Sequence, residues 1–228
     1  TGLHMSVPGG VPLGIWVAIP AYTGFVHVET AHCLNVEVYE ALNKNIPFLV
    51  TFHEQDPIIS RCRNAMIANF LASDPKHFTD MIFLDADVGF KPGTLVKLAQ
   101  YPVDIVGAVY PFRRDPVGFP VQFKEDRTPN AETGLIDVAG LPAGCLRISR
   151  KALETMIDRF PGLMYEEDNV PQGHTWALFD FVRRPTKDGR NIFCGEDYTF
   201  CAIAREAGFN IWCDADVEMQ HIGHKKFQ

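Results

Sequence analysis

The chain has 228 residues and a formal net charge of −7, with 46% hydrophobic and 21% charged residues. That length suits one domain with a sizeable core, and the composition is ordinary for a soluble globular protein. The negative charge disfavours nonspecific binding to nucleic acid or to an anionic membrane, although it leaves room for a local basic patch. No apolar run is long enough for a transmembrane helix, and no basic segment with an apolar core after it indicates a signal peptide.

Two further features bound the class of protein. Residues 1–4, which precede Met5, are interpreted as an expression remnant outside the fold. The cysteines form no C-x-x-C pair, so neither a zinc site nor a disulfide framework is predicted. We therefore expect reduced, mostly buried thiols in a cytoplasmic protein.

The first half of the chain alternates short apolar runs with segments of helical spacing. A buried strand is predicted over residues 14–20, where a proline ends an apolar run. Helices are predicted over residues 28–43, 58–72 and 93–100, and further strands over 47–52, 81–84 and 104–110. This alternation predicts an α/β fold with a largely parallel sheet.

The second half is richer in loops. Short strands are predicted over residues 121–123, 134–138, 145–148 and 210–213, and helices over 150–159 and 196–207. Residues 160–191 contain many prolines, glycines and charges, and a hairpin turn is expected at Lys187-Asp188-Gly189-Arg190. One domain with a loop-rich second half is the simplest organisation.

The motif Asp85-Ala86-Asp87 follows the most apolar of the predicted strands. In open α/β sheets, ligands bind beyond the carboxyl ends of the strands. Two unpaired carboxylates at such a place would repel each other and would be costly to desolvate. Mg²⁺ and Mn²⁺ prefer oxygen ligands and often bind one or two carboxylates together with substrate phosphates. The motif therefore fits a divalent metal that holds a diphosphate.

The same motif could also have a purely structural role or belong to a phosphatase. One aspartate could cap the following helix while the other pairs with a lysine or arginine. A phosphatase of the haloacid dehalogenase type would use the first aspartate as a nucleophile. Its motif continues D-x-D-x-[TV], whereas Gly89 stands at the last position here, and the motif follows two strand–helix units.

Charged and polar residues also open two predicted helices. Arg61, Arg63 and Asn64 begin the helix over residues 58–72. A helix N-terminus favours anions, and arginine offers planar donors to phosphate or to a uracil edge. Glu196 and Asp197 begin the last helix, where a carboxylate could act as a base toward an acceptor hydroxyl. Alternatively, the two arginines could lie on a solvated helix face, and the two acidic residues could simply complement the helix dipole.

His221 begins the sequence His221-Ile222-Gly223-His224 near the end of the chain. Its imidazole could complete a carboxylate and phosphate coordination sphere around Mn²⁺, although a surface position is also open. The letters match the class I aminoacyl-tRNA synthetase signature, but that signature follows the first strand of a much longer chain. We interpret the match as coincidence.

The motifs run in a fixed order along the chain: Ile19-Pro20-Ala21-Tyr22, Arg63-Asn64, Phe83-Leu84-Asp85-Ala86-Asp87, Ala143-Gly144-Cys145, Gly195-Glu196-Asp197-Tyr198-Thr199-Phe200-Cys201 with Ala207-Gly208-Phe209, and His221-Ile222-Gly223. This succession resembles glycosyltransferases with the GT-A fold, especially small bacterial, phage and large-virus members such as the first domain of a chlorella-virus capsid glycosyltransferase. The resemblance covers roughly residues 14–223. It implies one GT-A catalytic domain over residues 5–228, with a mostly parallel central sheet, a nucleotide-binding half at about 12–112 and a smaller, antiparallel, loop-rich acceptor-side half at about 113–228.

The resemblance also implies roles for single residues on the donor side. The donor nucleotide would be bound by Pro20, Ala21, Tyr22, Arg61, Arg63, Asn64, Asp85 and Ala86. Asp87 and His221 would bind Mn²⁺ or Mg²⁺, and Asp85 would contact the ribose, a metal-bound water or the metal itself.

On the acceptor side, the resemblance implies that Gly144 lets the backbone approach the donor sugar. Asp197, beside Glu196, would be the catalytic base of an inverting transfer. Acceptor selection is expected in residues 160–191, where Trp176 could face a sugar ring or could pack a small core.

The expected activity is metal-dependent transfer of a hexosyl or deoxyhexosyl group. The donor would be a nucleotide-diphosphate sugar, in the first place a UDP-sugar, and the acceptor a hydroxyl of a glycan, glycoconjugate or other molecule. One alternative is a nucleotidyltransferase that makes sugar nucleotides, which residues 20–24 disfavour because they lack a G-x-G-T/S-R phosphate loop. Another is a non-catalytic nucleotide-sugar-binding module of the same fold. No nucleic acid partner is expected.

Overall fold

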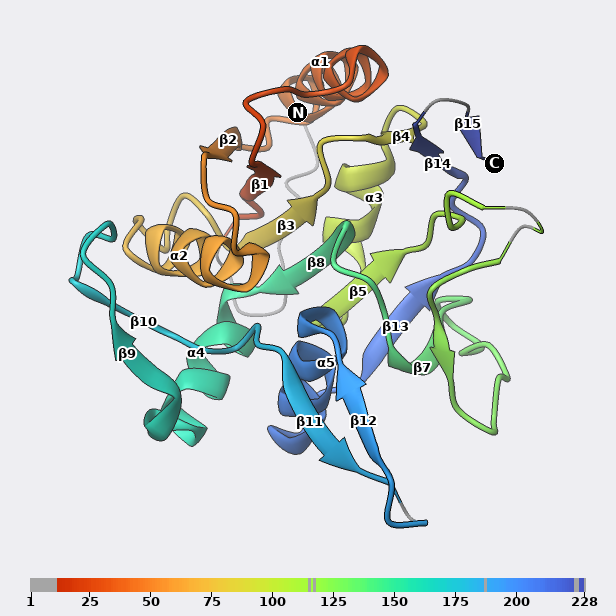
Figure 1. The fold of residues 1–228 in the computed structure, drawn as a ribbon. Helices are drawn as coiled ribbons and strands as arrows, with labels where there is room; N and C mark the ends of the chain where they lie inside the picture. Colours follow the sequence, from red (N-terminus) through yellow and green to blue (C-terminus); the bar gives the residue numbers. More distant parts are fainter. Residues whose placement is uncertain (1–11, 115, 117, 187, 224–225, 228) are drawn as a thin grey trace.

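The computed structural model describes residues 12–114, 116, 118–186, 188–223 and 226–227, so residues 1–4 lie outside the described part of the chain. Figure 1 shows the elements in chain order. The helices are α1 (Val28–Asn43), α2 (Ile59–Leu71), α3 (Thr94–Gln100), α4 (Arg150–Arg159), the 3₁₀ helix η1 (Pro161–Leu163) and α5 (Glu196–Glu206). The strands are β1 (Ile15–Ala21), β2 (Phe48–Glu54), β3 (Asp80–Leu84), β4 (Val88–Phe90), β5 (Ile105–Ala108), β6 (Gln122–Phe123), β7 (Ile136–Gly140), β8 (Cys145–Ser149), β9 (Met164–Glu166), β10 (His174–Trp176), β11 (Val182–Pro185), β12 (Asn191–Cys194), β13 (Ile211–Asp214), β14 (Met219–Ile222) and β15 (Lys226–Phe227).

Eight of the described strands form a central sheet in the order β2-β1-β3-β8-β5-β13-β7-β6. Strands β8 and β7 run against the others, which share one direction. The predicted α/β fold with a mostly parallel sheet is therefore confirmed. Strand β8 comes from the second half of the chain and lies between β3 and β5 of the first half, so the two halves build a single sheet.

Both faces of the sheet are covered by helices. Met81 and Phe83 of β3 pack into a core with side chains of α2, α4 and α5. Ile82 and Leu84 point the other way and pack with side chains of α1 and α3. A strand that is buried on both faces reads as a continuous apolar run, which explains why β3 was recognisable from sequence. The cysteines are unpaired and mostly buried, as predicted.

Residues 160–191 contain more regular structure than predicted. Strand β9 pairs with β10, and β11 pairs with β12, each pair antiparallel. The expected turn does connect β11 to β12, although Lys187 within it lies outside the described residues. These strands have three or four residues each, too few for a clear alternating pattern, so pairing rather than local preference produces them. None of the described helices is both long and apolar enough to cross a membrane.

Candidate functional site

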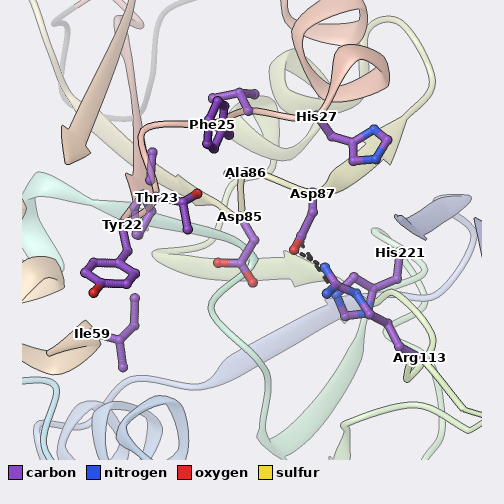
Figure 2. A pocket seen from close by; sticks show the side chains of 13 residues that line it. Tyr22, Thr23, Phe25, His27, Ile59, Asp85, Ala86, Asp87, Arg113 and His221 are labelled. Atoms are coloured by element: carbon purple, nitrogen blue, oxygen red, sulfur yellow. Dashed lines mark hydrogen bonds and ion pairs between the residues drawn. The ribbon is translucent and has the colours of Figure 1, made fainter. Parts of the chain in front are cut away.

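A pocket with a volume of about 530 Å³ opens beyond the carboxyl ends of β1 and β3. Figure 2 shows the side chains of Asp85 and Asp87 at its centre, with Tyr22 and Ile59 on one side and Arg113 and His221 on the other. The lining residues are Pro20, Ala21, Tyr22, Thr23, Phe25, Val26, His27, Ile59, Asp85, Ala86, Asp87, Arg113 and His221.

The loop after β1 forms one wall of this pocket. Gly24 adopts a φ of 72°, and its amide donates to the Ala21 carbonyl at 2.8 Å, so the chain turns sharply as it leaves the strand. The His27 amide then donates to the Ala86 carbonyl at 2.8 Å and ties this loop to the Asp85–Asp87 segment. Phe25 is 79% exposed and lines the pocket. Sequence reasoning missed Phe25, and the only signal was an aromatic residue directly after the turn glycine.

His221 reaches the pocket through a strand pairing that local pattern did not reveal. Strand β14 pairs with β4, which places His221 opposite Val88, and the Ile222 amide donates to the Asp87 carbonyl at 2.8 Å. His221 Nε2 consequently lies 3.6 Å from Asp87 Oδ1.

The other ring nitrogen sets the protonation of His221. Nδ1 bonds to the Pro111 carbonyl at 3.0 Å, so Nδ1 carries the hydrogen and Nε2 keeps a lone pair toward Asp87. Burial lowers the pKa of His221 from its ordinary value, and the nearby Arg113 charge lowers it further. The neutral imidazole therefore presents a ligating nitrogen beside a carboxylate.

Arg113 forms an ion pair with Asp87 Oδ2 at the same rim. It was not among the predicted site residues, and its signal was only a pair of arginines shortly after a strand. Among the described residues, no three His, Cys, Asp or Glu side chains converge as a metal site. Asp87 and His221 thus offer one oxygen and one nitrogen ligand, which fits a divalent cation that takes its remaining ligands from substrate phosphates and water.

A second group of acidic side chains lies behind the pocket around Arg63. Arg63 Nη1 donates to Glu196 Oε1 at 2.7 Å and to Asp197 Oδ1 at 2.5 Å, while Nη2 donates to Asp85 Oδ1 at 3.2 Å. We call these four residues the Arg63 cluster. Burial alone would lower the pKa of Arg63, but the three carboxylates outweigh it and raise that pKa. The guanidinium therefore stays charged and holds two distant segments together.

Asp85 is fixed on its other side as well. Tyr110 Oη donates to Asp85 Oδ2 at 3.0 Å, and the Asp85 amide donates to the Gly144 carbonyl at 3.0 Å. A Cβ on Gly144 would collide with Tyr110 Oη and with Asp85 Oδ2, so only glycine fits there without displacement. Both oxygens of Asp85 are therefore engaged by groups behind the pocket, whereas the partners of the Asp87 oxygens, Arg113 and His221, line the pocket itself.

Asp197 has the altered acidity expected of a general base. Burial raises its pKa to about 6, and the neighbouring charges of Glu196 and Asp85 raise it while Arg63 lowers it. A carboxylate with that pKa is ionised at neutral pH but is a better proton acceptor than an ordinary aspartate.

Three predicted site residues belong neither to the pocket lining nor to the Arg63 cluster and its contacts. Arg61 pairs with Asp56 at the surface, with Nη2 to Oδ1 at 2.9 Å. The Asn64 amide is used internally, because Nδ2 donates to the Phe179 carbonyl and Oδ1 accepts from the Phe179 amide, both at 2.9 Å. Trp176 packs partly buried against the core and contacts the His174 ring. Asn64 thus braces the segment before β11, which a sequence motif could not reveal.

No protein-family model matches the chain, and no curated protein matches it in sequence. Solved structures do match. A197 from STIV aligns with a TM-score of 0.53 and 15% identity over 94% of this chain and 93% of its own. The catalytic domain of Drosophila β1,4-galactosyltransferase 7, crystallised with xylobiose, aligns with a TM-score of 0.51 and 12% identity over 93% of this chain and 71% of its own. A glycosyltransferase involved in glycosylation of the major capsid of PBCV-1 aligns over 62% of each chain, at 14% identity and a TM-score of 0.32. The second match shows that the chain shares the fold of a glycosyltransferase catalytic domain.

Proposed function

We propose that this protein is a metal-dependent glycosyltransferase that moves a sugar from a UDP-sugar to an acceptor hydroxyl with inversion. One observation carries the proposal: Arg63 joins Asp85 of the strand-end motif to Glu196 and Asp197 of the last helix, directly behind an open pocket. The proposed donor site and the proposed base would thereby be adjacent, which supports a transferase, because a binding module or a structural ion pair would not require that arrangement.

The pocket chemistry supports the donor half of this proposal. Tyr22, at one end of the pocket, and Phe25, on its wall, offer aromatic faces to a nucleotide base. Asp87, His221 and Arg113 lie at the other end, where a cation and a guanidinium can hold a diphosphate. A bound Mn²⁺ or Mg²⁺ supplies Lewis-acid stabilisation to the leaving diphosphate. The protein contributes the ligands and orients the donor between the two ends.

The Arg63 cluster supports the transfer half. Asp197 would take the proton from the acceptor hydroxyl as that oxygen attacks the sugar. Asp85, held in place by Arg63 and Tyr110 and lining the pocket, would orient a donor hydroxyl with the lone pairs that these two hydrogen bonds leave free. Gly144 leaves the space that Tyr110 Oη and Asp85 Oδ2 occupy, and it thereby lets Asp85 keep the position from which it would meet the sugar.

The test is calorimetric titration of UDP in the presence and absence of Mn²⁺. The wild type should bind UDP in a metal-dependent way, and Asp87→Ala should weaken that binding by roughly tenfold or more because it removes a metal ligand. Asp168→Ala, which changes an exposed aspartate away from the pocket, is the matched control.

The outcomes separate the candidate functions. If the wild type does not bind UDP, the proposal is wrong. If it binds UDP equally well with and without Mn²⁺, the proposed metal dependence is wrong. Release of pyrophosphate from a nucleoside triphosphate and a sugar phosphate would instead identify a nucleotidyltransferase. Thermal stabilisation by a panel of UDP- and GDP-sugars, followed by acceptor trials, would identify the sugar.

A further inference from the structure

The β11–β12 hairpin projects from the body of the molecule beside α5, as Figure 1 shows. It is a separate two-stranded sheet among the described residues. Phe193 is 71% exposed and Ile192 is 51% exposed, although both are large apolar side chains. Exposed apolar side chains gathered on one projection indicate a surface that is covered when the protein works.

The strand register gives the hairpin two chemically different edges. Arg183 lies opposite Phe193, and Arg184 lies opposite Ile192. Because neighbouring residues of a strand point to opposite faces, each face carries one arginine on β11 and one apolar residue on β12. Phe181 stacks on Phe193 with ring centroids 5.5 Å apart and extends the apolar side of one face. The hairpin is therefore basic along β11 and apolar along β12.

The charge of the hairpin opposes that of the rest of the chain. Residues 181–194 hold four basic residues against one aspartate, a net charge of +3, in a chain whose net charge is −7. Arg190 pairs with Asp188 at 2.7 Å. Arg183 and Arg184 have no carboxylate partner among the described residues, so their charges are available to an anionic surface.

We propose that the β11–β12 hairpin docks the protein on an anionic membrane surface. Ile192 and Phe193 would enter the boundary between headgroups and acyl chains, while Arg183 and Arg184 would contact lipid phosphates. This surface lies outside the pocket, and the inference does not depend on the proposed function.

Three other occupants fit the hairpin less well. A polymer such as a nucleic acid or an acidic glycan could stack on Phe181 and Phe193, but it would leave Ile192 exposed on the opposite face. A second copy of the chain would bring the same positive charge to the contact. A lipid interface surrounds both faces of a projecting hairpin, so it covers Ile192 and Phe193 together.

Docking there would affect the candidate base directly. Strand β12 ends at Cys194, and α5 begins at Glu196, with only Gly195 between them. A hairpin held at a membrane would therefore hold Glu196 and Asp197 at a fixed distance from it. An acceptor hydroxyl presented at the membrane would then be delivered close to the base.

The experiment is co-sedimentation with phosphatidylcholine vesicles that contain or lack phosphatidylglycerol. We expect binding to the anionic vesicles only, weakening as salt rises. The double variants Ile192→Ser/Phe193→Ser and Arg183→Ser/Arg184→Ser should each lower the vesicle affinity by roughly tenfold or more. Leu42→Ser on α1 and Lys151→Ser on α4, which remove an equally exposed apolar side chain and an exposed charge elsewhere, should change nothing.

Further readouts guard against an unfolding artefact. Circular dichroism and thermal unfolding should match the wild type for every variant, because all four hairpin side chains are exposed or partly exposed. Phe193→Trp adds an indole at the apolar edge, and its emission should shift to the blue with anionic vesicles beyond any shift of the wild type.

The inference is overturned if the wild type ignores anionic vesicles or if the hairpin variants bind them as the wild type does. It is also overturned if the hairpin variants instead abolish a dimer in sedimentation velocity, or abolish binding to heparin or to a single-stranded oligonucleotide while vesicles remain unbound. Vesicle binding without UDP binding would leave this inference standing and sink the proposed function.

Discussion

The rim around Asp87 and the cluster around Arg63 hold acidic side chains in two different ways. Asp87 lies at the pocket opening, where its partners are the half-exposed Arg113 and the imidazole of His221. Asp85, Glu196 and Asp197 instead share one guanidinium that is almost fully buried. The two arrangements lie side by side, because Asp85 and Asp87 are two residues apart.

The difference matches what each region would have to do. A partly exposed ion pair is weak, so the rim can exchange Arg113 for a metal and a diphosphate at little cost. A buried guanidinium that pairs with three carboxylates keeps its geometry before any ligand arrives, and preorganised groups are the ones that contribute most to catalysis. We therefore expect the Asp87 ion pair to break when a ligand binds, and the hydrogen bonds of the Arg63 cluster to remain unchanged.

The largest effect is expected from Asp197→Asn. The amide cannot accept the acceptor proton, so the transfer rate should fall by roughly 10²- to 10⁴-fold. UDP binding should persist, since Asp197 does not line the pocket. Rate assays with the matching UDP-sugar and calorimetry with UDP measure the two quantities. Near-normal transfer by the variant would remove Asp197 as the base.

The acidity of Asp197 gives a pH dependence with a definite sign. With the pKa raised to about 6 by burial and by neighbouring carboxylates, the wild-type rate should fall as the pH drops through about 6 and the base becomes protonated. Glu196→Gln removes one of the neighbouring negative charges, so it should lower the pKa of Asp197 and move this acidic limb to lower pH. A limb that does not move would mean that another group titrates.

The next largest effect is expected on stability from Arg63→Met. Removing the guanidinium leaves three carboxylates without their cation, which should lower the free energy of unfolding by about 3–5 kcal/mol. Arg61→Met is the matched control on the same helix, where an exposed ion pair with Asp56 contributes little to stability, so the loss should be much smaller. Urea unfolding compares the two variants. Equal losses would show that the cluster does not depend on Arg63.

A smaller effect is expected from Gly144→Ala. The new methyl group would press on Tyr110 and Asp85, and relieving that overlap should cost about 1–3 kcal/mol and raise the KM for the donor. Gly162→Ala is the control, since a Cβ there meets no atom within 4 Å. Adding Tyr110→Phe to Gly144→Ala should restore part of the loss by removing the nearest oxygen. No recovery would mean that Asp85, not Tyr110, resists the methyl group.

The smallest effect is expected from Arg113→Gln at the rim, with opposite signs for two ligands. Removing the competing cation should tighten Mn²⁺ binding to the free protein by about two- to fivefold, the size of an exposed ion pair. UDP binding in the presence of Mn²⁺ should weaken, because a diphosphate contact is lost. Electron paramagnetic resonance measures the Mn²⁺ affinity, and calorimetry measures the UDP affinity. Arg114→Gln is the control, because the guanidinium of Arg114 lies over Phe112. Changes of the same sign would contradict an exchange of partners.

The sequence by itself determined the parts of this protein that depend on short stretches of chain. Helix α1 was predicted with the bounds that it has, and β3 was recognisable because burial on both faces makes it apolar throughout. The place of Asp85 and Asp87 at the end of β3 follows from the same local pattern. Periodicity and turn chemistry act over a few residues, so they can be read from a few residues.

Only the tertiary structure decided which distant segments meet. The pairing of β14 with β4 brings His221 to Asp87, and Arg63 reaches Asp197 across 134 residues of chain. The same packing turns Asn64 inward to Phe179 and places β8 against the strand direction between β3 and β5. Such choices rest on the summed burial and hydrogen bonding of the whole domain, in which each contact contributes little. No local pattern carries that sum. The motifs could be identified by sequence, and the family resemblance implied that they serve one site, but only the tertiary structure decided which contacts bring them together.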